Sequence, residues 1–128
     1  MSGAVTLRLV VRFCETDLMG IVHHANYLQY FEAGRVAWLK ARGVDILGEK
    51  VQFPVVEATV RYRKPARFDD ELDVETWVSE LKGASLTFAY AVRRGDELLC
   101  EGETRLACVG PTMGLQKIPA ELRAKLVD

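Results

Sequence analysis

The sequence predicts an α+β fold in which one long central helix is wrapped by a curved antiparallel sheet of about five strands. Five segments alternate apolar and polar residues with a period of two, and only one long segment carries an apolar stripe with helical spacing. The last four alternating segments follow one another in hairpin succession. A single helix buries its stripe best against a curved sheet, so this order of elements favours the arrangement.

The first strand is expected within residues 5–13, and the helix follows it after a loop. The strand residues expected to face the core are Val5, Leu7, Leu9, Val11 and Phe13. The helix is expected to begin at Asn26, which suits an N-cap, and to stop at Gly43. Its stripe consists of Tyr27, Tyr30, Phe31, Gly34, Trp38 and Ala41.

Four more alternating segments complete the predicted sheet. They lie at residues 56–63, 72–78, 86–92 and 99–108. Pro65 ends the first of them, and a short helix is expected at residues 119–126, begun by its proline. Because a curved sheet leaves long edges that another subunit commonly covers, we expect a homodimer or a homotetramer.

Composition points to a single globular domain spanning residues 1–128. The chain is 49% hydrophobic and 27% charged, and its formal net charge of −1 provides no electrostatic footprint for nucleic acid or an anionic membrane. No stretch approaches the ~20 apolar residues of a membrane span, and the N-terminus lacks a signal-peptide pattern. Three widely spaced cysteines argue against a disulfide framework. We therefore expect a cytoplasmic protein with no nucleic-acid partner and no stable membrane insertion.

The loop before the helix combines a carboxylate, a glycine and a helix N-terminus. Asp17 suits a local turn, which is one interpretation of it. Gly20 also permits close approach by a ligand, and the free N–H groups at the helix start suit polarisation of a carbonyl. An ionised aspartate in this position could attack a carbonyl or activate a water molecule. The loop is therefore the candidate site for acyl transfer chemistry.

The two histidines of the chain, His23 and His24, lie in this loop. Adjacent residues rarely converge on one ion, and no further ligands show the usual spacing, so no metal site is expected. We expect His24 to act through its backbone N–H rather than through its ring; an ordinary solvent-facing histidine is the alternative. Cys14 lacks an evident base partner, which disfavours a thiol nucleophile and favours a small core residue.

Charged residues beyond the loop allow two interpretations each. Glu32 either forms a surface ion pair with Arg35 at i+3 or reaches a pocket, across a subunit boundary. A basic cluster follows the second strand, and another cation lies at a strand turn: Arg61, Arg63, Lys64, Arg67 and Lys82. These cations form either a solvated face or a site for the phosphates of a ligand.

The loop and helix start together form a recognisable motif. It comprises Phe13, Glu15-Thr16-Asp17, Gly20-Ile21-Val22, His24 and Asn26-Tyr27, before an aromatic-rich helix. In this motif the chain resembles the 4-hydroxybenzoyl-CoA thioesterase branch of the hotdog-fold acyl-CoA thioesterases, which includes the YbgC-like enzymes. Residues 62–72 are similar to the exit of the family's second strand, and the resemblance runs from about residue 5 to residue 109.

The resemblance implies a hotdog fold and hydrolysis of an acyl-CoA thioester to a carboxylic acid and free coenzyme A, with no metal or organic cofactor. Asp17 matches the family's catalytic aspartate, which acts as nucleophile or general base. The backbone N–H of His24 matches the donor that polarises the thioester carbonyl. Gly20 and Asn26 would shape the loop and the helix entry, and Tyr27 would pack beneath them.

The resemblance also implies roles in substrate binding. Glu32 matches a carboxylate that contacts the acyl group in the hydroxybenzoyl enzymes, where it is an aspartate, and this departure puts a hydroxybenzoyl substrate in doubt. Lys82 and Ser85 match a region that meets the phosphates of coenzyme A, although Gly83 and Ala84 replace residues that are often basic there. Arg61, Arg63 and Lys64 are the other candidates for phosphate contacts.

Alternative functions on the same fold remain. A thioesterase acting on acyl carrier protein would need fewer phosphate contacts. A non-catalytic acyl-binding protein would need no catalytic residues. A dehydratase of this fold would use an Asp and His pair, for which His23 or His24 is present. The sequence does not predict the acyl group.

Overall fold

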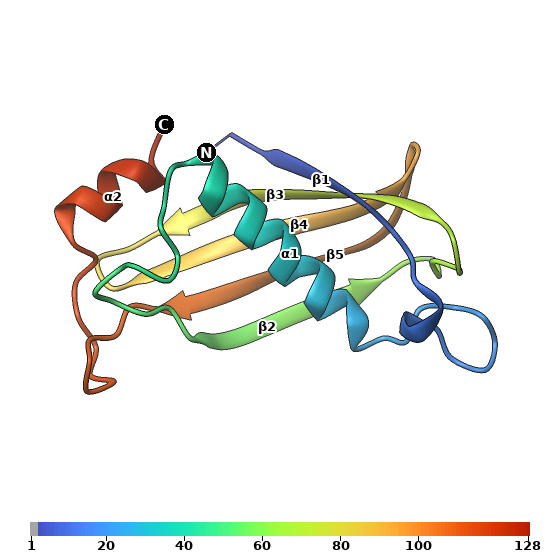
Figure 1. Cartoon of the computed structure of the whole chain (residues 1–128), viewed down its shortest axis with the longest axis horizontal. Helices are drawn as coiled ribbons and strands as arrows, with labels where there is room; N and C mark the ends of the chain where they lie inside the picture. Colours follow the sequence, from blue (N-terminus) through green and yellow to red (C-terminus); the bar gives the residue numbers. More distant parts are fainter. Residues whose placement is uncertain (1–2) are drawn as a thin grey trace.

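Five antiparallel strands form one sheet in the order β1-β3-β4-β5-β2, and helix α1 crosses one face of it (Figure 1). The structure is a computed structural model that describes residues 3–128. Its strands are β1 Val5–Val10, β2 Val55–Tyr62, β3 Glu71–Leu81, β4 Ser85–Arg94 and β5 Glu97–Ala107. Its helices are the 3-10 turn η1 Phe13–Glu15, α1 Asn26–Ala41 and α2 Ala120–Leu126. The predicted α+β fold with one long helix is confirmed.

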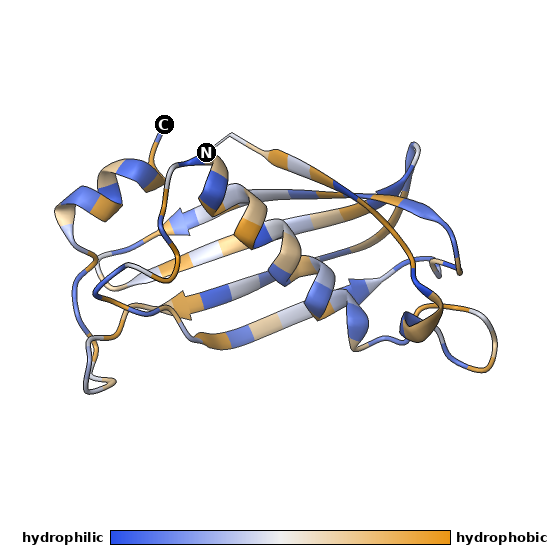
Figure 2. Ribbon diagram, in the orientation of Figure 1, coloured by the Kyte–Doolittle hydropathy of each residue, from blue (hydrophilic) through white to orange (hydrophobic). Residues whose placement is uncertain are grey.

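The strands alternate in hydropathy along the sheet, as Figure 2 shows. In β3 every second residue is buried, and these residues, Leu72, Val74, Thr76 and Val78, face the helix side. Strand β4 lies in the middle of the sheet and is buried on both faces from Leu86 to Val92. Strand β2 lies at an edge, and all of its residues except the half-buried Val60 are exposed.

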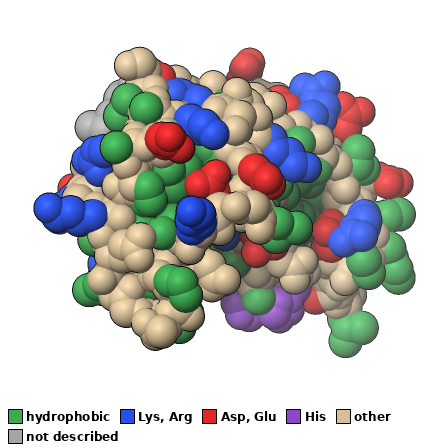
Figure 3. Space-filling model, turned by 60° about the vertical axis from the view of Figure 1, so that its left-hand side comes forward, with side chains coloured by type: hydrophobic (Ala, Val, Ile, Leu, Met, Phe, Trp, Pro, Cys, Tyr) green, Lys and Arg blue, Asp and Glu red, His purple; other side chains and the backbone are tan. Residues whose placement is uncertain are grey.

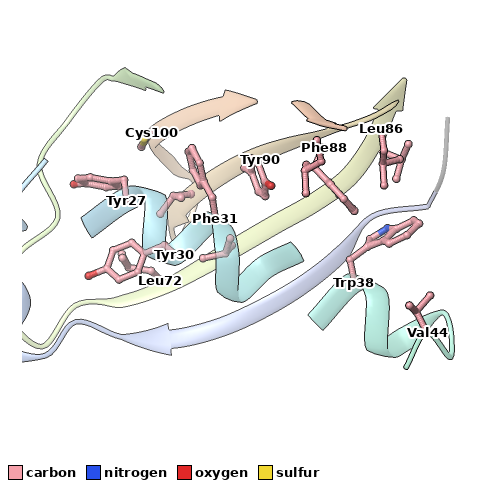
Figure 4. Close-up of a cluster of buried hydrophobic side chains, with 14 of the residues drawn as sticks. Tyr27, Tyr30, Phe31, Trp38, Val44, Leu72, Leu86, Phe88, Tyr90 and Cys100 are labelled. Carbon is pink, nitrogen blue, oxygen red and sulfur yellow. The ribbon is translucent and has the colours of Figure 1, made fainter. Parts of the chain in front are cut away.

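Helix α1 packs closely on the sheet through its predicted stripe. Phe31 stacks on Tyr90 of β4 with ring centroids 4.3 Å apart, and Trp38 meets Phe88 edge to face at 5.4 Å (Figure 4). Between them, a Cβ atom at Gly34 would lie 2.3 Å from Thr76 Oγ1. The missing side chain is therefore what lets the helix backbone approach β3.

Four details of the predicted elements are wrong. The last four strands do not all follow in hairpin succession, because the chain passes from β2, which pairs with β5 at one edge, to β3 beside β1. Strand β1 stops at Val10, and Phe13 is 74% exposed in η1, because Arg12 N–H donates to the Glu15 side chain and the chain turns away from the sheet. Ala41 is exposed at the helix end, where the stripe has passed the edge of the core. Ala25, not Asn26, is the N-cap, and it has no side-chain cap.

The ends of the helices otherwise match the prediction. Gly43 has a φ of +73° and donates its N–H to Lys40 O, so α1 stops there. Pro119 precedes α2. Among residues 3–128, no helix is long and apolar enough to cross a membrane.

Candidate active site

The loop between η1 and α1 is a small hairpin. Thr16 and Val22 form an isolated antiparallel bridge, and inside it Asp17 N–H donates to Ile21 O at 2.8 Å. A tight turn closes the tip, where Gly20 N–H donates to Asp17 O at 3.0 Å. Gly20 has a φ of +75°, a conformation that favours glycine, so the turn accounts for this residue.

The hairpin is attached to the connection between β2 and β3. Val22 N–H donates to Ala66 O at 2.9 Å, and Ile21 pairs with Arg67 in a second isolated bridge. Phe68 N–H donates to Gly20 O at 3.3 Å. Backbone hydrogen bonds therefore fix one side of the loop against the connection between β2 and β3.

The Asp17 carboxylate closes the turn with one oxygen and leaves the other unbonded. Oδ1 accepts the N–H of Met19 at 2.8 Å, as expected of an aspartate in a turn. Within residues 3–128 no donor bonds to Oδ2, and the residue is half-buried. The turn-forming interpretation and the catalytic one are thus compatible, since the turn fixes the carboxylate without using all of it.

The backbone N–H of His24 is also unbonded across the described part of the chain. Its neighbours are all engaged: His23 N–H donates to Glu15 O, Ala25 N–H to His23 Nδ1 and Asn26 N–H to His23 O. The carbonyl of His24 accepts the Tyr62 hydroxyl at 2.8 Å. An unbonded N–H just before an α-helix suits a carbonyl oxygen that becomes negative during reaction.

Asp17 and His24 line the same cavity, which has a volume of about 350 Å³. Its other lining residues are Ile21, Val22, Tyr27, Tyr62, Arg63, Lys64 and Pro65. Tyr27 is almost fully buried and its hydroxyl accepts Ala66 N–H at 3.1 Å. Burial raises the pKa of Tyr27, so this hydroxyl stays protonated at neutral pH. Four of the predicted site residues besides Asp17 therefore lie in one place: His24, Tyr27, Arg63 and Lys64.

The basic candidates lie in ion pairs. Arg63 and Arg61 both donate to Glu101 at 3.2 Å, and Lys64 donates to Glu97 at 2.8 Å. Only Arg63 and Lys64 reach the Asp17 cavity, while Arg61 lines a hollow on the sheet face opposite α1.

Glu32, Lys82 and Ser85 lie away from Asp17 in a single chain. Glu32 lines an apolar cavity of about 380 Å³ beside the C-terminal half of α1, at the end of the molecule that faces the viewer in Figure 3. Its predicted contact with Arg35 is long, 3.9 Å, because Arg35 is mostly buried and donates to Tyr90 Oη at 3.1 Å. Lys82 pairs with Glu80, and Ser85 begins β4 at the same end of the sheet.

Tyr62 and Ile21 line the cavity but are not among the predicted site residues, although Ile21 belongs to the motif. Tyr62 ends the edge strand β2 and reaches His24 only because β2 lies beside the start of α1. Ile21 lines the cavity as part of the hairpin. Cys14, expected as a small core residue, is exposed because it lies in η1 rather than in a strand.

The sequence pattern that defines the thioesterase superfamily matches residues 19–101. The chain belongs to the thioesterase superfamily. This thioesterase is 34% identical to the acyl-CoA thioester hydrolase YbgC of Escherichia coli O157:H7 over 105 residues, which cover 79% of the chain and 78% of the relative. The family expected from the Glu15–Tyr27 motif and the expectation of a thioester hydrolase are confirmed.

Solved structures confirm the hotdog fold of this thioesterase. A hypothetical protein from Thermus thermophilus superposes with a TM-score of 0.91 at 38% identity, covering 97% of this chain and 95% of that one. A DHNA-CoA thioesterase from Staphylococcus aureus superposes with a TM-score of 0.84 at 26% identity, covering 89% and 80%. The superfamily match begins at residue 19, two residues after Asp17.

Proposed function

We propose that this thioesterase hydrolyses acyl-CoA thioesters to a carboxylic acid and free coenzyme A at the Asp17 cavity. The observation that carries the proposal is the pairing of an unbonded carboxylate oxygen with an unbonded helix-start N–H on one cavity wall. Relatives named acyl-CoA thioester hydrolase and DHNA-CoA thioesterase support coenzyme A esters as the substrate class.

The two groups have complementary parts in the reaction. The His24 N–H donates to the thioester carbonyl oxygen and stabilises the negative charge that grows there, helped by the positive end of α1. Asp17 either attacks the carbonyl carbon, expelling the thiolate and leaving an anhydride that water hydrolyses, or takes a proton from an attacking water. In both routes the C–S bond breaks, and the thiolate leaves as free coenzyme A once protonated.

The phosphates of coenzyme A would meet Arg63 and Lys64. Both line the cavity, and more than half of each side chain is exposed. Their present partners, Glu101 and Glu97, are surface carboxylates that a phosphate could replace. Arg61, Lys82 and Ser85 are further candidates only where the ligand extends over the sheet.

A second copy of the chain would complete the acyl end of the site. Strand β2 pairs only with β5 and exposes Val55, Val56 and Tyr62 on an open edge. Antiparallel pairing of two β2 edges would place the Tyr62 end of one copy beside the Val55 end of the other. The cavity that contains Glu32 is lined by residues 51–53, just before β2, so it would adjoin the Asp17 cavity of the other copy. We therefore assign the acyl group to the Glu32 cavity and expect a homodimer or a homotetramer.

A thiol-release assay over short-chain, long-chain and aromatic acyl-CoA esters tests the proposal. We expect turnover of at least one coenzyme A ester, with a higher kcat/KM than the matched ester on acyl carrier protein. A strong preference for the carrier-protein ester would show that the natural substrate is carried by acyl carrier protein and not by coenzyme A. Ligand binding without thiol release from any ester would contradict hydrolysis altogether.

A further inference from the structure

Glu15 precedes the Asp17 loop and bonds both to Arg12 before the loop and to helix α1 after it. The residue is only 8% exposed, and a glutamate is rarely so buried unless its carboxylate is paired. Its Oε1 accepts Arg12 N–H at 2.8 Å and the Tyr30 hydroxyl at 3.1 Å. Its Oε2 accepts both Arg12 Nε at 3.3 Å and Arg12 Nη2 at 3.2 Å. The carboxylate is therefore fully engaged, unlike that of Asp17.

The backbone carbonyl of Glu15 makes the second half of this arrangement. It accepts His23 N–H at 2.9 Å and the side-chain amide of Asn26 at 2.7 Å. His23 directly precedes the unbonded N–H of His24, and Asn26 is the first residue of α1. This also explains Asn26, whose side chain joins the helix to the loop instead of capping the helix.

Asn26 and Tyr30 are one helical turn apart on α1. Asn26 bonds to the main chain of Glu15 and Tyr30 bonds to its side chain, so one face of the helix holds both parts of the residue. Figure 4 shows Tyr30 at the end of the buried cluster where α1 begins. Burial raises the pKa of Tyr30, and the Glu15 carboxylate raises it further, so the hydroxyl remains a donor at neutral pH.

We infer that Glu15 is a positioning residue that sets the distance between the Asp17 carboxylate and the His24 N–H. Asp17 follows it by two residues on one side, and His24 follows its bonded partner His23 on the other. A displacement of about 1 Å between reacting groups can cost about 100-fold in rate, so this restraint matters for kcat. The inference rests on the proposed thioesterase site.

The test compares Glu15→Ala, Glu15→Gln, Tyr30→Phe and the double variant Glu15→Ala/Tyr30→Phe, with a coenzyme A ester that the wild type hydrolyses. We expect Glu15→Ala to lower kcat about 10- to 100-fold while KM changes less than about threefold. Glu15→Gln keeps a neutral acceptor oxygen and should recover most of that loss. Tyr30→Phe should lower kcat several-fold alone and add nothing to Glu15→Ala, because Glu15→Ala already removes the one bond that Tyr30→Phe removes.

Amide hydrogen exchange gives a readout independent of turnover. Residues 16–25 should exchange faster in Glu15→Ala and Tyr30→Phe than in the wild type, while β3 and β4 stay unchanged. Asp73→Asn, which weakens a carboxylate–arginine pair with Arg8 on the sheet, is the control and should change neither readout. Should Glu15→Ala fail to fold, Tyr30→Phe decides the matter by the same two measurements.

Folded variants with wild-type kcat and wild-type exchange in residues 16–25 would overturn the inference. If the wild type releases no thiol from any ester, the proposed function fails, and the exchange data alone then support or overturn the restraint by Glu15.

Discussion

Single residues of this thioesterase differ sharply in reactivity according to where the fold places them. Cys100 is buried, and burial raises its pKa to about 12, with the Glu101 carboxylate adding to the effect. Burial also raises the pKa of Cys108. Cys14 is exposed in η1. Because the thiolate is the reactive form, burial and a raised pKa protect Cys100 and Cys108, whereas Cys14 is accessible to a reagent.

We predict that a disulfide exchange reagent at pH 8 modifies one thiol rapidly in the native protein and the remaining two only on unfolding. The Cys14→Ser variant should lose the rapid phase and keep the slow one. A rapid phase that survives in Cys14→Ser would show that the buried thiols are accessible. Cys14 lies next to Glu15, so its modification is also expected to slow turnover.

The catalytic candidates could be predicted at this scale because Asp17 and His24 lie within one short segment. Residue type and order were enough to bring a carboxylate, a glycine and a helix start together. Glu15 belongs to the same motif, but its proposed positioning role could not be predicted, because it depends on Tyr30 and on backbone bonds that exist only in the fold. The same holds for Tyr62, whose contact with His24 spans 38 positions of sequence.

At the scale of elements, α1 and β3 pack closely through a glycine of the helix. Gly34 faces Thr76 Oγ1 and Val74 Cγ1, which would lie 2.3 Å and 2.9 Å from an added Cβ atom. Thr76 is fully buried, and its hydroxyl has no hydrogen-bond partner within residues 3–128. A larger side chain at Gly34 would therefore clash with β3 and push the helix away from the sheet.

We predict that Gly34→Ala lowers the free energy of unfolding by about 1–3 kcal/mol, the usual cost of overpacking a core. Gly83→Ala is the control, because a Cβ atom there has no atom within 4 Å, and its unfolding free energy should stay near that of the wild type. Adding Thr76→Ala removes the nearest atom, so the double variant Gly34→Ala/Thr76→Ala should lose less stability than the sum of the single variants. Urea denaturation of the wild type, the three single variants and the double variant measures these free energies; additive losses would contradict the contact.

The element boundaries show why a sequence pattern predicts more of the middle of an element than of its ends. The alternation continued from Val5 to Phe13, yet β1 ends at Val10, because the Glu15 side chain accepts the N–H of Arg12 and favours a turn. Alternating polarity does not report such a competing hydrogen bond. Gly43 was a reliable stop because the conformation it adopts favours glycine in any context.

Across the whole molecule, two cavities lie toward opposite ends of α1, and in our proposal each forms only part of a site. The Asp17 cavity is lined by the proposed catalytic groups and two cations, while the Glu32 cavity is mainly apolar. The α+β class, the order of elements along the chain and the β3-β4-β5 hairpins followed from sequence, because alternation, turns and one helical stripe are local features. The position of β2 beside β5 and the two cavities did not, since each brings together residues that are distant in sequence, and the acyl end, as proposed, needs a second chain.

The kcat of Asp17→Asn on a coenzyme A ester that the wild type hydrolyses tests the central claim most directly. Asparagine keeps the Oδ1 that accepts Met19 N–H, so the turn survives while the charge and the nucleophile are lost. Asp45→Asn is the matched control, because Asp45 also closes a turn, through Gly48 N–H at 3.2 Å, and lines neither cavity. We predict that Asp17→Asn lowers kcat by at least about 100-fold and that Asp45→Asn leaves it unchanged. Wild-type kcat in a folded Asp17→Asn protein would contradict the account.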